Sequence, residues 1–199
     1  MNKQDVVAVV LGGPSSEAEV SRRTGAAIAE ALREKGYNAV ELELVPEKLV
    51  EQLREIDAKV VFNAVHGMYG EDGRLQSILE AIKMPYTGSG VLASAVAMDK
   101  NATKRFLLSA NISTPKSLMY NKRFDKDAEL IEKEIIETFG VPVVIKAADQ
   151  GSSIGVEIVK SEADVKTALE NVFRYSDLVL VEECINGKEL TCGVMEVEG

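Results

Sequence analysis

Two glycines and a glutamate near the start of the chain have the spacing of a ligand-binding turn. Gly12 and Gly13 stand between an apolar run and a helical pattern, and Glu17 falls in the first turn of that pattern. Backbone N–H groups and a helix N-terminus at such a turn can bind anionic or polar groups. Glu17 could hold a substrate ammonium or only complement the helix dipole. The glycines by themselves are equally compatible with a turn that binds no ligand.

His66, the only histidine, is the second candidate. It ends an apolar run and leads into the segment 67–73, which contains three glycines. Glycine lets the backbone approach a ligand closely, and loops that follow strands commonly carry binding residues. A structural histidine with its own hydrogen-bond partners is the alternative, and the residue type does not choose between the two.

The segment 151–155 has the proportions of a phosphate-binding loop. Its two serines stand between two glycines, and Lys146 lies near the end of the preceding apolar run. Small residues let main-chain N–H groups reach phosphate oxygens, and the lysine supplies positive charge. The segment lacks the Gly-Lys-Ser/Thr ending of a Walker A motif. A flexible hairpin loop is the alternative interpretation.

Acidic residues end a further apolar run. Glu182 and Glu183 follow Leu180 and Val181 directly. A carboxylate and backbone groups at a strand end could bracket the edge of an adenine ring, although surface charge is the ordinary explanation. The nearby serine loop favours the nucleotide interpretation.

The elements that must position these residues change character near residue 98. Up to that point, short apolar runs alternate with helical patterns, which predicts a parallel sheet covered by helices. The predicted strands are the runs 6–11, 39–44 and 60–65. We therefore predict an α/β domain over residues 1–98.

The first predicted helix of this domain has marked ends. Ser16 and Glu19 have the spacing of a capping box, and Gly36 suits the C-terminal end. Its apolar residues share one face at the 3.6-residue period, and they are Val20, Ala27, Ile28, Ala31 and Leu32.

Residues 99–199 have an α+β pattern. The predicted helices are 100–110, 127–139 and one capped by Ser161, and the predicted strands are 114–120, 142–147, 155–159, 178–182 and 189–197. The runs 142–147 and 155–159 are joined by a loop, which predicts an antiparallel pair. A turn signal follows the last run without a partner strand, so we expect this domain to continue beyond residue 199.

Composition excludes several classes of protein. The chain has 199 residues, 46% of them hydrophobic, and a net charge of -9, which disfavours nucleic acid and anionic membrane surfaces as partners. Cys184 and Cys192 lack the spacing of a metal site or a disulfide scaffold. The apolar start is too short for a signal peptide, and no run is long enough to span a membrane. We therefore expect a cytoplasmic protein with reduced thiols.

Taken together, these segments resemble the D-alanine–D-alanine ligases of the ATP-grasp superfamily. The segments that carry the resemblance are 12–21 (GGPSSEAEVS), 66–73 (HGMYGEDG), 86–90 (YTGSG), 98–100 (MDK) and 146–155 (KAADQGSSIG). The resemblance implies a Rossmann-like first domain followed by an ATP-grasp subdomain. It also implies ATP-dependent coupling of two D-alanines through an acyl phosphate, for peptidoglycan precursors, commonly by a homodimer.

The resemblance assigns roles by position. Glu17 and Ser152 are the implied catalytic pair, with Glu17 on the ammonium of the first D-alanine and His66 near its carboxylate. The resemblance also implies nucleotide contacts. The phosphates would be bound by Lys100, Lys146 and Ser153, the adenine amino group by Glu182, and the ribose by Glu189. Glu183 and Ile185 would offer backbone hydrogen bonds to adenine.

The resemblance places the magnesium ligands after residue 199. We therefore expect the 199 residues alone not to ligate D-alanine. Two alternatives stay open: a non-catalytic nucleotide- or amino-acid-binding module, and a related ligase with another second substrate, such as D-lactate.

Overall fold

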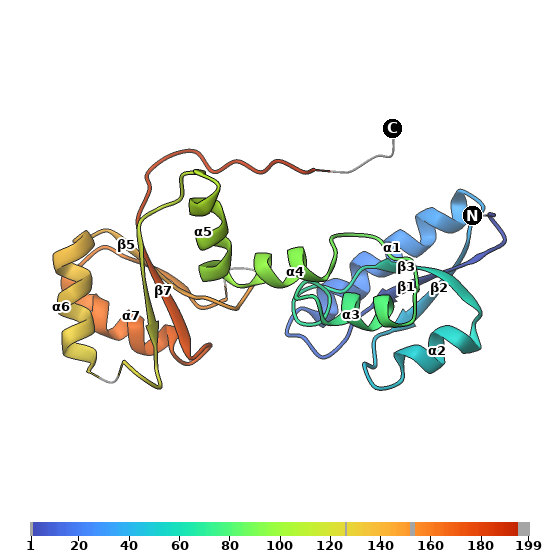
Figure 1. Cartoon of the computed structure of the whole chain (residues 1–199), viewed down its shortest axis with the longest axis horizontal. Coiled ribbons are helices and arrows are strands. Elements are labelled where there is room, and N and C mark those ends of the chain that lie inside the picture. The colour runs from blue at the N-terminus through green and yellow to red at the C-terminus, as the bar shows by residue number, and fades with distance from the viewer. Residues whose placement is uncertain (1, 126, 152–153, 195–199) are drawn as a thin grey trace. The chain divides into compact units, whose positions relative to one another are not determined.

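The computed structural model describes residues 2–125, 127–151 and 154–194. By contact, it divides into unit 1, comprising Met1–Ile112 and Ala148–Ile154, and unit 2, comprising Ser113–Ala147 and Gly155–Gly199. Each unit has its own sheet and its own core (Figure 1). This division by contact does not test the domain boundary predicted between residues 98 and 99, which stays a prediction.

Unit 1 is built on a three-stranded parallel sheet in the order β2-β1-β3. The strands are β1 (Val6–Leu11), β2 (Asn38–Glu43) and β3 (Ala58–Asn63). The central strand β1 is buried on both faces from Val7 to Val10. A continuous apolar run is what such a strand requires, so the predicted parallel α/β fold is confirmed.

Helices cover both faces of this sheet. They are α1 (Ala18–Glu34), α2 (Leu49–Glu55) and α3 (Arg74–Ala81). Two further helices, α4 (Val91–Met98) and α5 (Lys100–Ser109), follow in the chain. On one face, Ala29 of α1 packs with Val7 and Val9. On the other face, leucines of α2 and α3 pack with Ala8 and Val10. The carboxyl ends of the strands therefore open between the two helical layers.

Helix α1 begins differently from its sequence pattern. Its N-cap residue is Glu17, and no side chain caps it in the usual way. The predicted capping box of Ser16 and Glu19 is therefore wrong. Instead, the backbone N–H of Glu17 donates to Ser15 Oγ at 3.0 Å. The predicted end is confirmed, because Gly36 has φ +81° and its N–H donates to Arg33 O at 2.9 Å.

The buried face of α1 agrees only in part with the predicted one, because Ile28 and Leu32 are half-buried and pack against the core but three other predicted residues do not. Its buried residues are Ser21, Gly25 and Ala29, whereas Val20, Ala27 and Ala31 are exposed. A Cβ added at Gly25 would lie 2.6 Å from Leu11 Cβ. The helix lies so close to β1 that only small side chains fit between them, and the periodicity of large apolar residues could not show this.

Unit 2 is built on a four-stranded antiparallel sheet in the order β4-β7-β5-β6. The elements are β4 (Ser117–Asn121), α6 (Ala128–Phe139), β5 (Val143–Ala147), β6 (Val156–Val159), a 3-10 turn (Glu162–Asp164), α7 (Val165–Val172) and β7 (Leu178–Glu183). Helices α6 and α7 cover one face, where Ile135 and Val172 pack with Ile145 and Val181. The predicted antiparallel pair β5-β6 is confirmed.

The strand predicted over residues 189–197 is not formed in its described part. Residues 189–194 are neither helix nor strand, and Leu190 and Val194 are 87% and 93% exposed. Residues 195–197 lie outside the described residues. An apolar pattern makes a strand only where a neighbouring strand pairs with it, and no described strand does so here.

The described helices are all too short or too polar to cross a bilayer.

Candidate functional site

A buried serine ties the start of α1 to two strands of unit 1. Ser21 is 0% exposed, and its Oγ accepts a hydrogen bond from Gly12 N–H and donates one to Ala64 O, both at 2.7 Å. Gly12 follows β1, and Ala64 follows β3. The Ser21 hydroxyl therefore links the segments that follow β1 and β3 to helix α1.

Removing this hydroxyl should destabilise the chain. Ser21→Ala leaves a buried N–H and a buried carbonyl without a partner, and we expect a loss of about 2 kcal/mol of unfolding free energy, measured by urea denaturation. Ser77→Ala is the matched control, because exposed Ser77 Oγ donates to Gly73 O at 2.7 Å within α3. Equal losses of unfolding free energy in the two variants would show that the Ser21 hydroxyl stabilises the chain no more than the Ser77 hydroxyl does.

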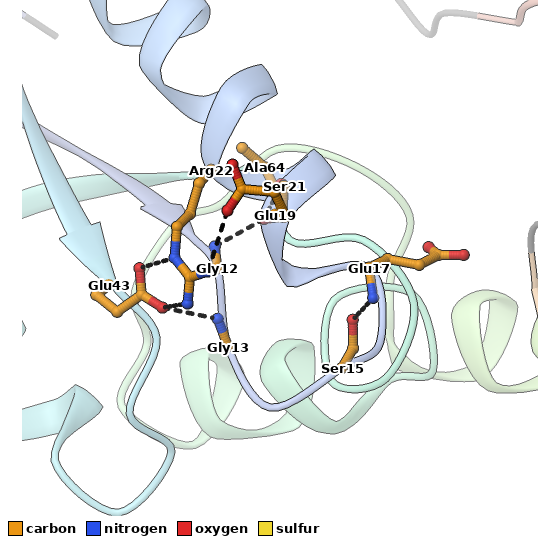
Figure 2. Close-up of polar contacts among 9 residues, drawn as sticks. All are labelled: Gly12, Gly13, Ser15, Glu17, Glu19, Ser21, Arg22, Glu43 and Ala64. Carbon is orange, nitrogen blue, oxygen red and sulfur yellow. Dashed lines mark hydrogen bonds and ion pairs between the residues drawn. The ribbon is translucent and has the colours of Figure 1, made fainter.

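A carboxylate of the protein occupies the glycine turn. Glu43 Oε1 accepts from Gly13 N–H at 3.2 Å, and both Glu43 oxygens accept from Arg22, at 2.7 and 3.1 Å (Figure 2). Arg22 lowers the pKa of Glu43, and the Gly13 N–H acts in the same direction against partial desolvation. Because the N–H groups of Gly12 and Gly13 both have partners within the protein, the structure favours a turn that binds no ligand.

Glu17 and His66 are linked through Ser15. Ser15 Oγ donates to His66 O at 2.8 Å and accepts from Glu17 N–H. The Glu17 side chain points away from α1 (Figure 2), and its carboxylate has no hydrogen-bond or ion-pair partner among the described residues. It lies beside Gly67, where an added Cβ would be 3.3 Å from Glu17 Oε2.

The two side chains line different cavities of unit 1. Glu17 lines a pocket of about 330 Å³ together with Gly67, Arg74 and Gly151. His66 lines a second pocket of about 440 Å³, and its Nε2 forms a 3.2 Å hydrogen bond with Thr24 Oγ1. One ring nitrogen of His66 thus has a structural partner, as the alternative interpretation required, while the ring still borders a cavity.

The loop after His66 is held by its own polar groups. Gly70 O accepts from Asn63 Nδ2 at 2.8 Å and from Gln76 Nε2 at 2.7 Å. Gly67 N–H donates to Glu71 Oε2 at 2.9 Å, and Gly67 has φ +68°. The bond at Gly67 holds backbone that lines the Glu17 pocket, and the two bonds at Gly70 hold backbone that lines the His66 pocket.

In unit 2, the sheet face without helices carries a partly buried ion pair. Lys146 on β5 and Glu182 on β7 form this pair, and Glu182 is 6% exposed. By strand register, Val156 and Ile158 of β6 lie on the same face, and Ile158 is 60% exposed. A charged pair beside exposed apolar side chains is suited to a ligand with a flat ring and a charged group.

The other residues with predicted nucleotide roles are placed as follows. Glu183 exchanges two hydrogen bonds with Lys116: its N–H donates to Lys116 O at 3.1 Å, and its Oε1 accepts from Lys116 N–H at 2.8 Å. Ile185 and Glu189 are exposed after β7. Lys100 belongs to unit 1, where its Nζ donates to Gln150 O. Ser152 and Ser153 lie outside the described residues.

Sequence reasoning gave no role to Ser15, Ser21, Arg22 or Glu43. Ser15 and Ser21 stand in the glycine-rich segment 12–21, but their partners are 51 and 43 residues away along the chain. No local pattern contains such a contact.

Comparison with known proteins gives two family matches. Residues 43–89 match the model described as "D-ala D-ala ligase N-terminus", and residues 107–199 match "D-ala D-ala ligase C-terminus". The D-alanine–D-alanine ligase of Carboxydothermus hydrogenoformans is 43% identical over 189 residues, which are 95% of this chain and 60% of the relative. The chain thus spans about 60% of the length of that curated relative.

Solved structures agree. The D-alanine–D-alanine ligase of Bacillus anthracis matches with a TM-score of 0.81 and 35% identity, covering 92% of this chain and 58% of the other. A structure of the ligase from the same organism complexed with ATP matches with a TM-score of 0.79 and 33% identity, covering 92% and 60%. With both family models, the sequence relative and the fold in agreement, the chain belongs to the D-alanine–D-alanine ligase family.

Proposed function

We propose that these residues form the first-substrate site and part of the nucleotide site of an ATP-dependent D-alanine–D-alanine ligase that makes peptidoglycan precursors in the cytoplasm. The observation that carries the proposal is the Glu17 carboxylate in its pocket of about 330 Å³. It has no partner among the described residues, so it can pair with the ammonium of a small amino acid. The match to D-alanine–D-alanine ligases supports D-alanine as that amino acid.

In the proposed reaction, a carboxylate oxygen of the first D-alanine attacks the γ-phosphorus of ATP, and ADP leaves. The amine of the second D-alanine then attacks the acyl carbon of the acyl phosphate, loses a proton, and expels inorganic phosphate. Such chemistry depends on positioning and charge neutralisation more than on covalent catalysis. Glu17 would hold the first ammonium and help to position Ser152, and His66 would lie near the carboxylate.

The nucleotide would use the helix-free face of the unit 2 sheet. Lys146 would contact phosphate, Glu182 the adenine amino group, and Glu183 and Ile185 the adenine edge. Lys100 and Ser153 would add phosphate contacts, and Glu189 would hold ribose. The engaged N–H of Glu183 limits its backbone contribution to adenine.

Magnesium and a second subunit complete the proposal. Phosphoryl transfer from ATP uses magnesium to neutralise charge. The described residues contain no cluster of three or more His, Cys, Asp or Glu that could hold a metal ion. We also propose a homodimer formed through unit 1, because the apolar helix α4 exposes Leu92 and buries only Ser94.

The test is a D-alanine titration of the isotope-labelled chain, followed by NMR. We expect D-alanine to shift amide signals near Glu17, and Glu17→Gln to weaken its affinity by at least about tenfold, because a charge-assisted hydrogen bond is lost. Glu19→Gln is the matched control, since Glu19 is exposed in the same helical turn and pairs with Arg22 at 3.6 Å. No shift on adding D-alanine, or equal affinities for the wild type and Glu17→Gln, would contradict the proposed site.

A further inference from the structure

We propose that Ser15 is a positioning residue for the amino-acid site, whose hydroxyl sets the spacing between Glu17 and the His66-Gly67 backbone. The inference rests on the proposed function and deepens it. It assigns a role to a residue that contacts no reacting atom and acts through its neighbours.

The Ser15 hydroxyl both donates and accepts a hydrogen bond. Its proton goes to His66 O at 2.8 Å, and one lone pair of Oγ accepts the Glu17 N–H at 3.0 Å. The backbone that carries the carboxylate and the backbone that carries the imidazole are therefore two hydrogen bonds apart, although His66 follows Ser15 by 51 residues. Lengthening either bond would change the distance between the two binding groups.

The position of the Glu17 carboxylate depends strongly on this backbone link. Its oxygens make no hydrogen bond or ion pair with any described residue, so no contact at the carboxylate end holds the side chain. The backbone at Glu17, the N-cap residue of α1, sets the point from which the side chain extends into the pocket. Ser15 bonds the N–H of that same residue.

Gly67 shows how closely the three residues are packed. A Cβ added there would lie 3.3 Å from Glu17 Oε2 and 3.4 Å from Ser15 Oγ. A Cβ at position 67 would therefore be in tight contact with both side chains, and the φ of +68° also favours glycine there. A ligand ammonium on Glu17 would lie against this same backbone.

The alternative is that Ser15 only caps α1 and contributes to stability. The ratio of D-alanine affinity to ATP affinity separates the two roles. A general loss of stability would lower both affinities, whereas a positioning role would lower only the affinity for D-alanine. In the proposed function, adenine and one phosphate contact come from Glu182 and Lys146 of unit 2, whereas Ser15 belongs to unit 1.

The experiment compares three variants of the whole 199-residue chain: Ser15→Ala, Ser15→Thr and Ser77→Ala. D-alanine affinity is measured by NMR titration, ATP affinity by calorimetry and stability by urea denaturation. We expect Ser15→Ala to bind D-alanine about tenfold more weakly with unchanged ATP affinity. Ser15→Thr, which keeps the hydroxyl, should restore binding, and Ser77→Ala should lower only stability.

The outcomes separate the inference from the proposed function. Wild-type D-alanine affinity in Ser15→Ala would overturn the positioning role while the proposed function stood. Equal weakening of D-alanine and ATP binding would show a general structural effect and would also overturn it. A wild-type chain that binds ATP but not D-alanine would overturn the proposed first-substrate site, and the role of Ser15 with it.

Discussion

Replacing Gly70 with alanine should lower the unfolding free energy by more than about 4 kcal/mol, and D-alanine binding should be lost with it. A Cβ at this position would overlap the carbonyl oxygen of Val65 and lie 2.5 Å from its carbonyl carbon. The clash is with backbone, so no rotamer change can relieve it. It would also displace Gly70 O, on which Asn63 and Gln76 converge. Urea denaturation followed by circular dichroism measures the effect.

Gly90→Ala is the matched control for Gly70→Ala. Gly90 has φ -72°, and an added Cβ would meet nothing nearer than Tyr86 Oη at 3.8 Å. We expect this variant to be as stable as the wild type. Similar stability of both variants would mean that the loop after His66 tolerates a rearrangement that its tight packing argues against.

Replacing Lys146 with methionine should weaken ATP binding by about a hundredfold, since charge-assisted hydrogen bonds to phosphate contribute about 3 kcal/mol at most. Methionine keeps an unbranched apolar side chain, so the change removes mainly the charge. Glu182 loses its ion pair with Lys146 as well, which should destabilise unit 2. Calorimetric titration with ATP, at a temperature where circular dichroism shows a folded chain, measures the affinity.

The control for Lys146→Met is Lys160→Met. Lys160 is an exposed lysine directly after β6 and lies outside the ion pair. It should leave ATP affinity unchanged. If Lys146→Met bound ATP as tightly as the wild type, the nucleotide could not use the helix-free face in the way we propose.

The strands were the most predictable part of the fold. β1 has the predicted bounds 6–11, because an unbroken apolar run of this length is typical of a strand buried on both faces of a parallel sheet. The antiparallel β5-β6 pair also follows from the short loop between the two runs, whereas the order β2-β1-β3 was not predicted and comes from the structure. Residues 189–194 show the limit, since a strand pattern has no structure without a partner strand.

Packing and polar contacts were less predictable. Large apolar residues identified only part of the buried face of α1: Ile28 and Leu32 do pack against the core, but the close approach of Gly25 to Leu11 is a property of the pair and not of the helix. The candidate residues Glu17 and His66 could be found from motifs, but Ser15 and Ser21 could not. Their bonds reach across the sheet to residues far along the chain, and only the folded structure brings those partners together.

The carboxylate at the end of β2 has a consequence for recognising cofactor-binding proteins. Dinucleotide-binding folds combine glycines after the first strand with an acidic residue after the second, which binds ribose. This chain has both features, yet Glu43 turns back to Arg22 and the Gly13 N–H. A side chain of the protein itself thus binds the glycine turn. A motif search that scored only the glycines after the first strand and the acidic residue after the second would count the chain among nicotinamide or flavin proteins. In this chain the Glu43 carboxylate is held by Arg22 of the first helix, at 2.7 and 3.1 Å, and a motif search does not contain that contact.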